Sequence, residues 1–299
     1  MKTFSFEGRS GELISLEPFN ELILSWNGYR PPQGRWVFYV SLYNGSWSPY
    51  IKYAEWGAAS QKTFQRSLSN ISTHQDVIAP QKGYATGFRY VVKSEEGASL
   101  NTLHNISIFC RDTALFEIKP PQNLSSICLE RVFPHSQMAL SHPRHRDLCS
   151  PTSTTAAINF LLKKKEVNPL EIAQKVHDSE FDIYGNWILN TAAAYEALGG
   201  NYQTFVARLP DFTFVHQQLI KALPVIVSVK GPLPGAPLPY ERGHLILLIG
   251  YSDGQVLCMD PAFNTDAETL ISYPLEPFLE AWGARRNLAY LFISNSYRG

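Results

Sequence analysis

The sequence has no excess of charge of either sign. Its 299 residues include 26 Lys and Arg and 26 Asp and Glu, so the formal net charge is zero with His neutral. Nucleic-acid-binding proteins usually carry a basic excess or a basic stripe, and the balance therefore argues against a nucleic-acid partner. Disorder is also excluded, because 44% of the residues are hydrophobic and 13% are aromatic.

Long hydrophobic runs are absent as well. A membrane helix needs roughly 18 or more consecutive apolar residues, whereas the longest apolar stretches, residues 223–229 and 245–251, are only as long as strands. The start of the chain lacks the apolar core of a secretory signal. We therefore expect no membrane span, and a protein that is cytoplasmic or is exported by a route without an N-terminal signal.

Cysteine is scarce and scattered. The four cysteines form no C-x-x-C pair, which argues against a disulfide framework or a Cys-rich zinc site and favours free thiols in a reducing compartment. There is no phosphate-binding loop of the G-x-x-x-x-G-K-[ST] or G-x-G-x-x-G type. His135, His142 and His145 precede Cys149, but this loop-like set is a weak zinc candidate. We expect no cofactor and no metal.

The first half of the chain has the pattern of strands and turns. Residues 35–43 alternate between two faces, and further strands are predicted over residues 21–26, 86–92, 104–110 and 126–133. Turn residues such as Asn-Gly and Pro-Pro-Gln-Gly separate these stretches. Short strands at this spacing predict a β-sandwich domain.

The second half alternates helices and strands. Helices are predicted over residues 151–164, 169–176, 187–198, 214–222 and 275–282, and strands over residues 224–229, 245–251, 255–259 and 289–294. The change of pattern places the boundary between about residues 115 and 135, with a Pro-rich linker at residues 117–123. We therefore predict an α+β protein with a β-sandwich accessory domain over residues 1–120 and a second domain over residues 121–299.

Cys149 is the first candidate for chemistry, since it lies directly before a predicted buried helix. Pro151 suits the first helical turn, which places Cys149 at or just before the helix N-terminus. The helix dipole and unpaired N–H groups there favour a thiolate, and the N–H groups can form part of an oxyanion hole. A lone cysteine is more often a small buried apolar residue, so Cys149 alone is weak support for catalysis.

Two residues later in the chain strengthen the catalytic interpretation. His244 begins an apolar strand directly after Gly243, where a neutral imidazole can accept a thiol proton. Asp260 ends the next predicted strand, so a hairpin would bring it close to His244 and fix the tautomer. Separately, His244 also fits a hydrogen-bonded strand-end histidine and Asp260 an Asp-Pro turn. Together with Cys149 they form a candidate nucleophile, base and orienting acid.

From about residue 132 to residue 294 the chain resembles the papain-fold cysteine peptidases related to the double-glycine-leader (bacteriocin-processing) peptidases. The resemblance depends on the order and spacing of short motifs and covers slightly over half of the chain. The matching stretches are Ser136-Gln137, Cys149-Ser-Pro-Thr-Ser153, Gly243-His244 with Gly250-Tyr251, and Asp260-Pro261. One departure is Ser150, which stands where the family usually has Gly.

The resemblance implies a papain-like cysteine peptidase domain in the second half of the chain. It makes Cys149 the nucleophile, His244 the general base, Asp260 the orienting residue and Gln137 an oxyanion donor. The expected function is that of a thiol hydrolase that cleaves a peptide or amide bond in a peptide or protein substrate. The first half more weakly resembles the β-rich domain that precedes the peptidase domain in some bacterial members.

Two alternative functions stay open at this stage. One is a catalytically inactive relative that binds or recruits a partner through its Trp-rich first domain, where exposed Trp side chains would stack on a glycan or a peptide. Packing in the domain core is the favoured interpretation of these side chains, which are Trp26, Trp36, Trp47 and Trp56. The other alternative is an amidase, deamidase or transpeptidase that uses the same three residues.

Overall fold

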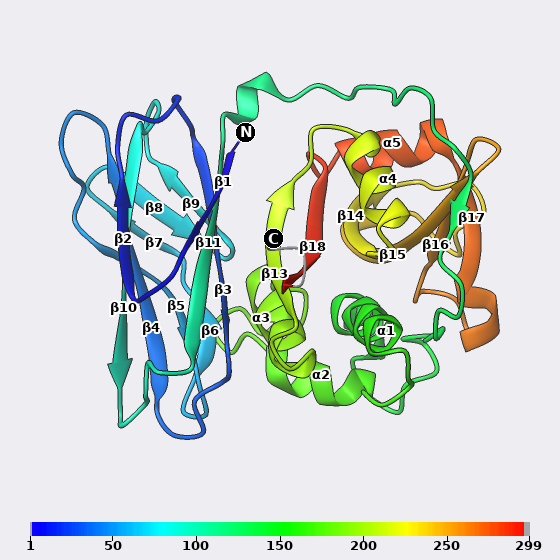
Figure 1. Cartoon of the computed structure of the whole chain (residues 1–299), viewed down its shortest axis with the longest axis horizontal. Helices are drawn as coiled ribbons and strands as arrows, with labels where there is room; N and C mark the ends of the chain where they lie inside the picture. The colour runs from blue at the N-terminus through cyan, green and yellow to red at the C-terminus, as the bar shows by residue number, and fades with distance from the viewer. Residues whose placement is uncertain (1, 296–299) are drawn as a thin grey trace.

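The computed structural model describes residues 2–295, which form two parts side by side (Figure 1). The first part, drawn in blue to cyan, consists of strands. The second part, drawn in green to red, combines strands and helices. None of the helices within residues 2–295 has the length and apolar character needed to cross a bilayer.

The first part contains two antiparallel sheets. One has six strands in the order β1-β11-β3-β9-β8-β7, and the other has five in the order β2-β10-β4-β5-β6. Their bounds are β1 (Lys2–Phe6), β2 (Ser10–Leu13), β3 (Glu21–Gly28), β4 (Arg35–Tyr43), β5 (Ile51–Trp56), β6 (Gln61–Thr63), β7 (Arg66–Leu68), β8 (Ile71–His74), β9 (Val77–Pro80), β10 (Gly87–Glu95) and β11 (Leu103–Arg111).

Aromatic side chains join the two sheets. Trp26 of β3 stacks on Phe38 of β4, with ring centroids 4.2 Å apart, and contacts the edge of Trp56 of β5 at 5.9 Å. Trp26, Trp36 and Trp56 are fully buried. The packing interpretation is confirmed for these three side chains, and stacking on a ligand is wrong for them. Trp47 is half-buried, and the guanidinium of Arg89 lies 4.5 Å from its ring centroid.

The second part combines helices with one antiparallel sheet. The strands of this sheet follow the order β13-β18-β14-β15-β16-β17, and β12 pairs with β15. In Figure 1, α1, α2 and α3 lie below β14 and β15, and α4 and α5 lie above them. The bounds are β12 (Ile127–Cys128), α1 (Cys149–Leu162), α2 (Pro169–Val176), α3 (Trp187–Ala197), β13 (Tyr202–Arg208), α4 (Phe212–Ile220), β14 (Val225–Gly231), β15 (Tyr240–Ser252), β16 (Gln255–Met259), β17 (Leu270–Pro274), α5 (Leu275–Gly283) and β18 (Leu288–Ser294).

The predicted strand over residues 126–133 is wrong for most of its length. Only Ile127–Cys128 pairs with β15, and Leu129 adds one backbone hydrogen bond to Ile249. Arg131 has a φ of 62°, which turns the chain out of the extended conformation. The helices and strands predicted in the second half are all present; α2 and β16 have the predicted ends, and the ends of the others are shifted. For example, α4 begins at Phe212 because Asp211 caps it through the Thr213 N–H.

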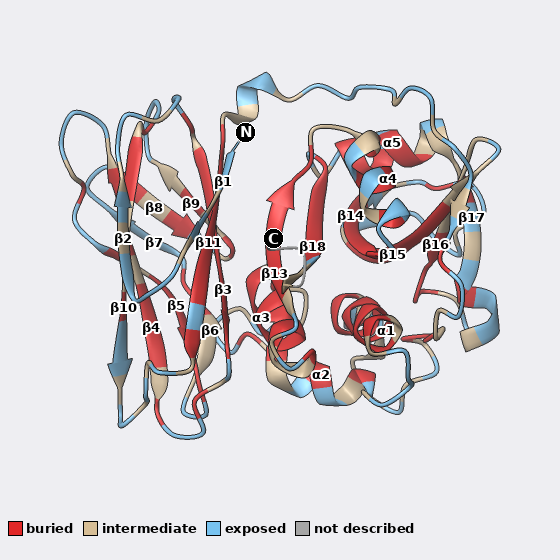
Figure 2. Cartoon of the chain, viewed as in Figure 1, coloured by how far each residue is buried: buried red, intermediate tan, exposed pale blue. Residues whose placement is uncertain are grey.

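Strand β13 was not predicted, and its sequence explains why. Its polar residues Gln203 and Thr204 are buried instead of facing solvent, and the Thr204 hydroxyl donates to the carbonyl of Thr191 on α3 at 2.7 Å. The Asn27 side chain of β3 donates to the Thr204 carbonyl at 2.6 Å and accepts from the Thr204 N–H at 2.8 Å. Figure 2 shows β3 and β13 as largely buried strands, so the two parts share a packed interface.

Candidate active site

Cys149 is the first residue of α1, with Pro151 in the first helical turn. The side chain is partly exposed and lines a cleft of about 710 Å³. As the first helical residue, Cys149 has an N–H group without a partner in its own helix. The predicted position of Cys149 at the helix N-terminus is therefore confirmed by the fold.

The predicted hairpin exists and brings His244 to Asp260. Strands β15 and β16 pair antiparallel, with Leu247 opposite Met259 and Leu248 opposite Cys258. Continuing this register places Asp260 opposite Ile246, so that His244, two residues earlier in β15, is its diagonal neighbour on the same face of the sheet. His244 Nε2 lies 2.7 Å from Asp260 Oδ1, and both side chains are buried.

A hydrogen bond between α1 and β15 holds the segment with Cys149 against the segment with His244. The Ser153 hydroxyl, one turn into α1, donates to the carbonyl of Leu245 at 2.9 Å, and both groups are buried. Because Leu245 follows His244 directly, this bond fixes the start of β15 against the first turn of the helix. The Cys149 side chain lies near enough to His244 to help raise the pKa of the imidazole, and both side chains line the same cleft. Since Nε2 is engaged by Asp260, Nδ1 is the ring nitrogen left for the thiol.

Opposing effects act on the pKa values of His244 and Asp260. Burial lowers the pKa of His244, but the Asp260 carboxylate and the hydrogen bonds to Asp260 and Cys149 outweigh it and raise that pKa to about 10. Burial raises the pKa of Asp260, but His244 and two tyrosine hydroxyls outweigh it and hold that pKa below its usual value. The buried pair is therefore an imidazolium beside a carboxylate at neutral pH.

Tyr240 and Tyr273 complete the surroundings of Asp260, and the sequence analysis missed both. Their hydroxyls donate to Asp260 Oδ2 at 2.7 Å and 2.6 Å. Oδ1 accepts from His244 and from the backbone N–H of Ala262 at 3.0 Å. The only signal for Tyr240 in the sequence is its position four residues before His244, because β15 extends beyond the predicted strand and begins at Tyr240.

Gln137 lies in the same cleft as Cys149 and is only 3% exposed. Its backbone N–H donates to the carbonyl of Pro261, directly after Asp260, at 2.9 Å. The side-chain Nε2 donates to the Arg146 carbonyl at 2.8 Å. A carboxamide NH₂ has two hydrogens, so this contact uses one and leaves a second N–H.

Ser150 does not face the cleft, although the family usually has Gly at this position. Its side chain is buried, and its hydroxyl lies 2.9 Å from the hydroxyl of Tyr290 on β18. The added side chain therefore contacts the sheet beneath α1. It leaves the space in front of Cys149 unobstructed.

The cleft has an apolar wall that comes from the Pro-rich segment before β15. Pro237, Leu238 and Pro239 line it beside His244, and Leu238 is 54% exposed. Met138 and Ala262 also line the cleft. The lining provides apolar contacts for a substrate chain next to Cys149.

The histidines that precede Cys149 do not form a metal site. His135 Nε2 contacts Asn159 Nδ2 at 3.2 Å, and His142 Nδ1 accepts from the Arg144 N–H at 3.1 Å. Within residues 2–295, no group of three or more His, Cys, Asp or Glu side chains is arranged to hold a metal ion.

Comparisons with known proteins concern the second part of the chain. Among solved structures, a Bacillus anthracis protein described as a C39-like peptidase has 16% sequence identity and a TM-score of 0.45, with 57% of this chain and 98% of that chain covered. A double-glycine-motif protease from an AMS/PCAT transporter, solved with its leader peptide, has 12% identity and a TM-score of 0.36, with 57% and 99% covered.

No curated protein sequence matches this chain. The model of the Peptidase_C39-like family matches residues 130–290, which is more than half of the 299 residues and includes Cys149, His244, Asp260 and Gln137. The resemblance seen in the order of the motifs is thereby confirmed. The chain belongs to the Peptidase_C39-like family.

Proposed function

We propose that the protein is a cysteine peptidase that cleaves a peptide bond with Cys149 as nucleophile, His244 as acid and base, and Asp260 as the orienting residue. The observation that carries this proposal is the position of His244, whose Nε2 lies 2.7 Å from Asp260 Oδ1 and which lines the same cleft as Cys149. Membership of the Peptidase_C39-like family supports the same reaction class.

In the proposed reaction, His244 is an imidazolium because it already holds the proton of the Cys149 thiol, and the thiolate attacks the carbonyl carbon of the substrate. A C–S bond forms, and the carbonyl oxygen becomes an oxyanion. The Cys149 backbone N–H and the second N–H of Gln137 are the proposed donors to that oxygen. His244 then protonates the leaving amine as the C–N bond breaks. The neutral His244 deprotonates a water molecule, which hydrolyses the thioester and restores the thiolate and the imidazolium.

Selective alkylation tests the nucleophile directly. Of the four cysteines, all free, Cys110 and Cys258 are buried, whereas Cys128 is exposed and makes a matched control. We expect iodoacetamide at neutral pH to label Cys149 much faster than Cys128, because His244 stabilises the thiolate. Labelling of Cys149 no faster than Cys128 would contradict an activated thiol.

A peptide library then separates an enzyme from an inactive relative. Wild type and the Cys128→Ala variant are expected to yield the same cleavage products, and Cys149→Ala none. Products that persist in Cys149→Ala, or an absence of products from wild type, contradict the peptidase. Ammonia release without chain cleavage would indicate an amidase or deamidase that uses the same residues.

We also propose the division of the chain into a β-sandwich accessory domain over residues 1–120 and a papain-like peptidase domain over residues 121–299. In support, β11 ends at Arg111, and every described strand from β12 onward joins the single sheet of the second part. The family model begins at residue 130, inside the second domain. Limited proteolysis is expected to cut within the exposed linker at residues 117–123 and to release two fragments.

A further inference from the structure

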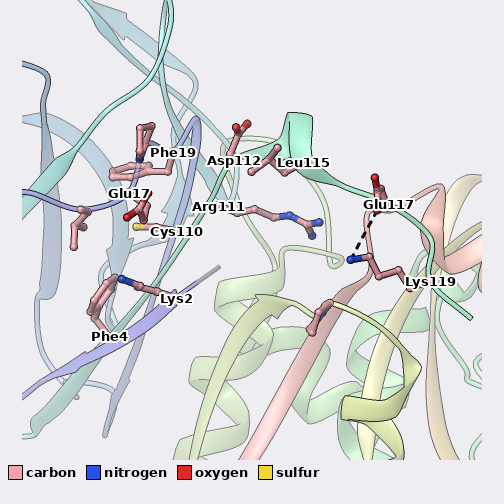
Figure 3. Close-up of a pocket in the computed structure, with 13 residues that line it drawn as sticks. Lys2, Phe4, Glu17, Phe19, Cys110, Arg111, Asp112, Leu115, Glu117 and Lys119 are labelled. Atoms are coloured by element: carbon pink, nitrogen blue, oxygen red, sulfur yellow. Dashed lines mark ion pairs between the residues drawn. The ribbon is translucent and has the colours of Figure 1, made fainter. Parts of the chain in front are cut away.

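A second cavity, of about 510 Å³, lies between the two parts of the molecule, away from Cys149 (Figure 3). Its lining comes from β1, from the end of β11, from the linker that follows, and from Pro210 in the second part. It shares no lining residue with the cleft that holds Cys149. The proposed peptidase reaction therefore does not use this cavity.

Arg111 is the buried charge of this cavity. The residue is only 9% exposed, and its side chain extends from the end of β11 into the space between the two parts (Figure 3). Its buried Nη1 has no hydrogen-bond partner among the described residues. A face of the guanidinium is covered by Phe116, whose ring centroid is 4.8 Å away. Nη1 is therefore a hydrogen-bond donor to which no residue within 2–295 supplies an acceptor.

The carboxylate that would normally pair with Arg111 is engaged elsewhere. Glu21 on β3 lies directly opposite Arg111 in the strand register. Both oxygens of Glu21 are instead bound by Arg208 of β13, through Nε and through Nη2 at 2.9 Å. Burial is the main cause that lowers the pKa of Arg111; Arg208 and Arg286 lower it further, whereas Glu21 and Asp112 act in the opposite direction. This region therefore holds more guanidinium groups than its buried carboxylate can neutralise.

The acidic residues at the rim do not supply the missing partner. Asp112 Oδ1 accepts from Asn20 Nδ2 at 3.2 Å and from the Ala114 N–H at 2.9 Å. Glu117 pairs with Lys119 at 3.8 Å, and both are largely exposed (Figure 3). Glu17 is exposed to solvent. No ion pair joins Arg111 to any carboxylate within residues 2–295.

The remaining walls are mainly apolar. Phe4, Leu16, Phe19, Leu115 and Pro210 line the cavity around Arg111. Small-molecule sites typically combine such walls with a few polar groups that fix orientation, in volumes of about 300–1,000 Å³. A guanidinium recognises carboxylate and phosphate oxygens through paired N–H groups.

We propose that this cavity binds an organic anion, with a carboxylate or phosphate headgroup on Arg111 and an apolar chain against the walls. A ligand held there would contact both parts of the molecule and the linker between them. It would therefore hold the two parts in their present arrangement without touching the proposed catalytic residues.

Calorimetric titration with three probes of equal chain length tests the proposal. Hexanoate and hexyl phosphate carry the two headgroups, and 1-hexanol carries none. The protein is the full-length Cys149→Ala variant, so that the active-site thiol cannot contribute. We expect at least one anion to bind, and its affinity relative to the other identifies the headgroup. Binding of 1-hexanol as tight as the anions, or no binding of either anion at millimolar concentration, overturns the proposal.

Variants of Arg111 locate the binding. Arg111→Gln is expected to weaken anion binding about tenfold to a hundredfold, which corresponds to the loss of a hydrogen bond between charged groups. Arg66→Gln is the matched control, because Arg66 is exposed in β7 at the opposite edge of the same sheet. Equal affinity in wild type and Arg111→Gln, or equal loss in both variants, contradicts the site.

The melting temperature distinguishes the loss of the binding site from a folding defect. Because Nη1 of Arg111 has no hydrogen-bond partner within residues 2–295, Arg111→Gln without ligand is expected to melt no lower than wild type, while the anion no longer raises its melting temperature. If Arg111→Gln does not fold, Arg111→Lys keeps the charge but loses the paired N–H groups. It should then bind the anion about tenfold more weakly, and wild-type affinity in this variant overturns the proposal.

Discussion

The ring of Tyr240 lies nearly parallel to the imidazole of His244, with the centroids 4.1 Å apart and an angle of 20° between the planes. The hydroxyl of the same tyrosine donates to Asp260 Oδ2 at 2.7 Å. Tyr240 thus covers one face of the imidazole and also holds the carboxylate at its edge. His244 is fixed by the stack on its face and by Asp260 at Nε2, with Nδ1 left toward Cys149.

Two variants of Tyr240 separate the contribution of its stack on His244 from that of its hydrogen bond to Asp260. Tyr240→Phe keeps the ring but removes one hydrogen bond to Asp260, so we expect kcat/KM to fall about tenfold. Tyr240→Ala also removes the stack, and we expect a larger loss. Tyr273→Phe is the matched control, because it removes a hydrogen bond to the same oxygen. Equal losses in Tyr240→Ala and Tyr240→Phe would show that the stack does not position His244.

Asp260→Asn is expected to lower activity by about tenfold to a hundredfold, the loss of a hydrogen bond between charged groups, because an amide can still orient the imidazole in a Cys-His-Asn arrangement. Burial lowers the pKa of His244, and the carboxylate is the main group that raises it. The variant should therefore show a His244 pKa well below that of wild type. NMR titration of the His244 ring protons measures this value, and an unchanged pKa would contradict the assigned ion pair.

The pH dependence of activity follows from the same pair. The pKa of His244 is raised to about 10, so we expect the imidazolium that protonates the leaving amine to persist through neutral pH. The profile of kcat/KM should then fall on its alkaline side near that value in wild type. In Asp260→Asn the alkaline fall should move to lower pH. Identical alkaline sides in the two proteins would argue against His244 as the titrating group.

Stability should also depend on His244 above neutral pH. Because the folded-state pKa of about 10 exceeds the unfolded value of about 6.5, the stabilisation is complete below 6.5 and is lost as pH rises through the folded pKa. Denaturant unfolding of wild type and His244→Gln from pH 6 to 10 tests this sign. The difference in unfolding free energy should shrink as pH rises, and a constant difference would contradict the linkage.

The buried ion pair between Glu21 and Arg208 joins β3 to β13, and its side chains are 5% and 6% exposed. Arg208→Met leaves the Glu21 carboxylate without this partner, and we expect a loss of about 3–5 kcal/mol in the free energy of unfolding. Replacing both residues, as Glu21→Leu with Arg208→Met, should lose less, because no charge stays buried. A double variant that loses as much as the two single variants combined would show no coupling between Glu21 and Arg208, which contradicts the expectation.

Much of the candidate site followed from local sequence. The N-terminal position of Cys149 required only a buried helix and Pro151 in its first turn, both of which are visible in residue order. The register of His244 and Asp260 required two apolar strands and a short turn between them, since neighbouring antiparallel strands bring such ends together. The strand over residues 35–43 was equally readable, because its alternation matches the two faces of a sheet.

Contacts between residues far apart in sequence were not readable in this way. Strand β13 shows no alternating pattern that predicts a strand. The side chain of Asn27, 177 residues earlier, hydrogen bonds to the backbone of Thr204. Tyr240 and Tyr273 gained a role only when β15 and β17 placed both hydroxyls on one oxygen of Asp260.

The sequence by itself therefore determined most helices and strands of the second part, the place of Cys149 at a helix start and the hairpin that joins His244 to Asp260, because each depends on neighbours along the chain. Tertiary structure alone decided which way Ser150 points, which tyrosines hold Asp260, and why Arg111 has no carboxylate partner within residues 2–295. Those outcomes depend on buried polar groups that find their partners across the fold, and partner choice at such distances leaves no local pattern.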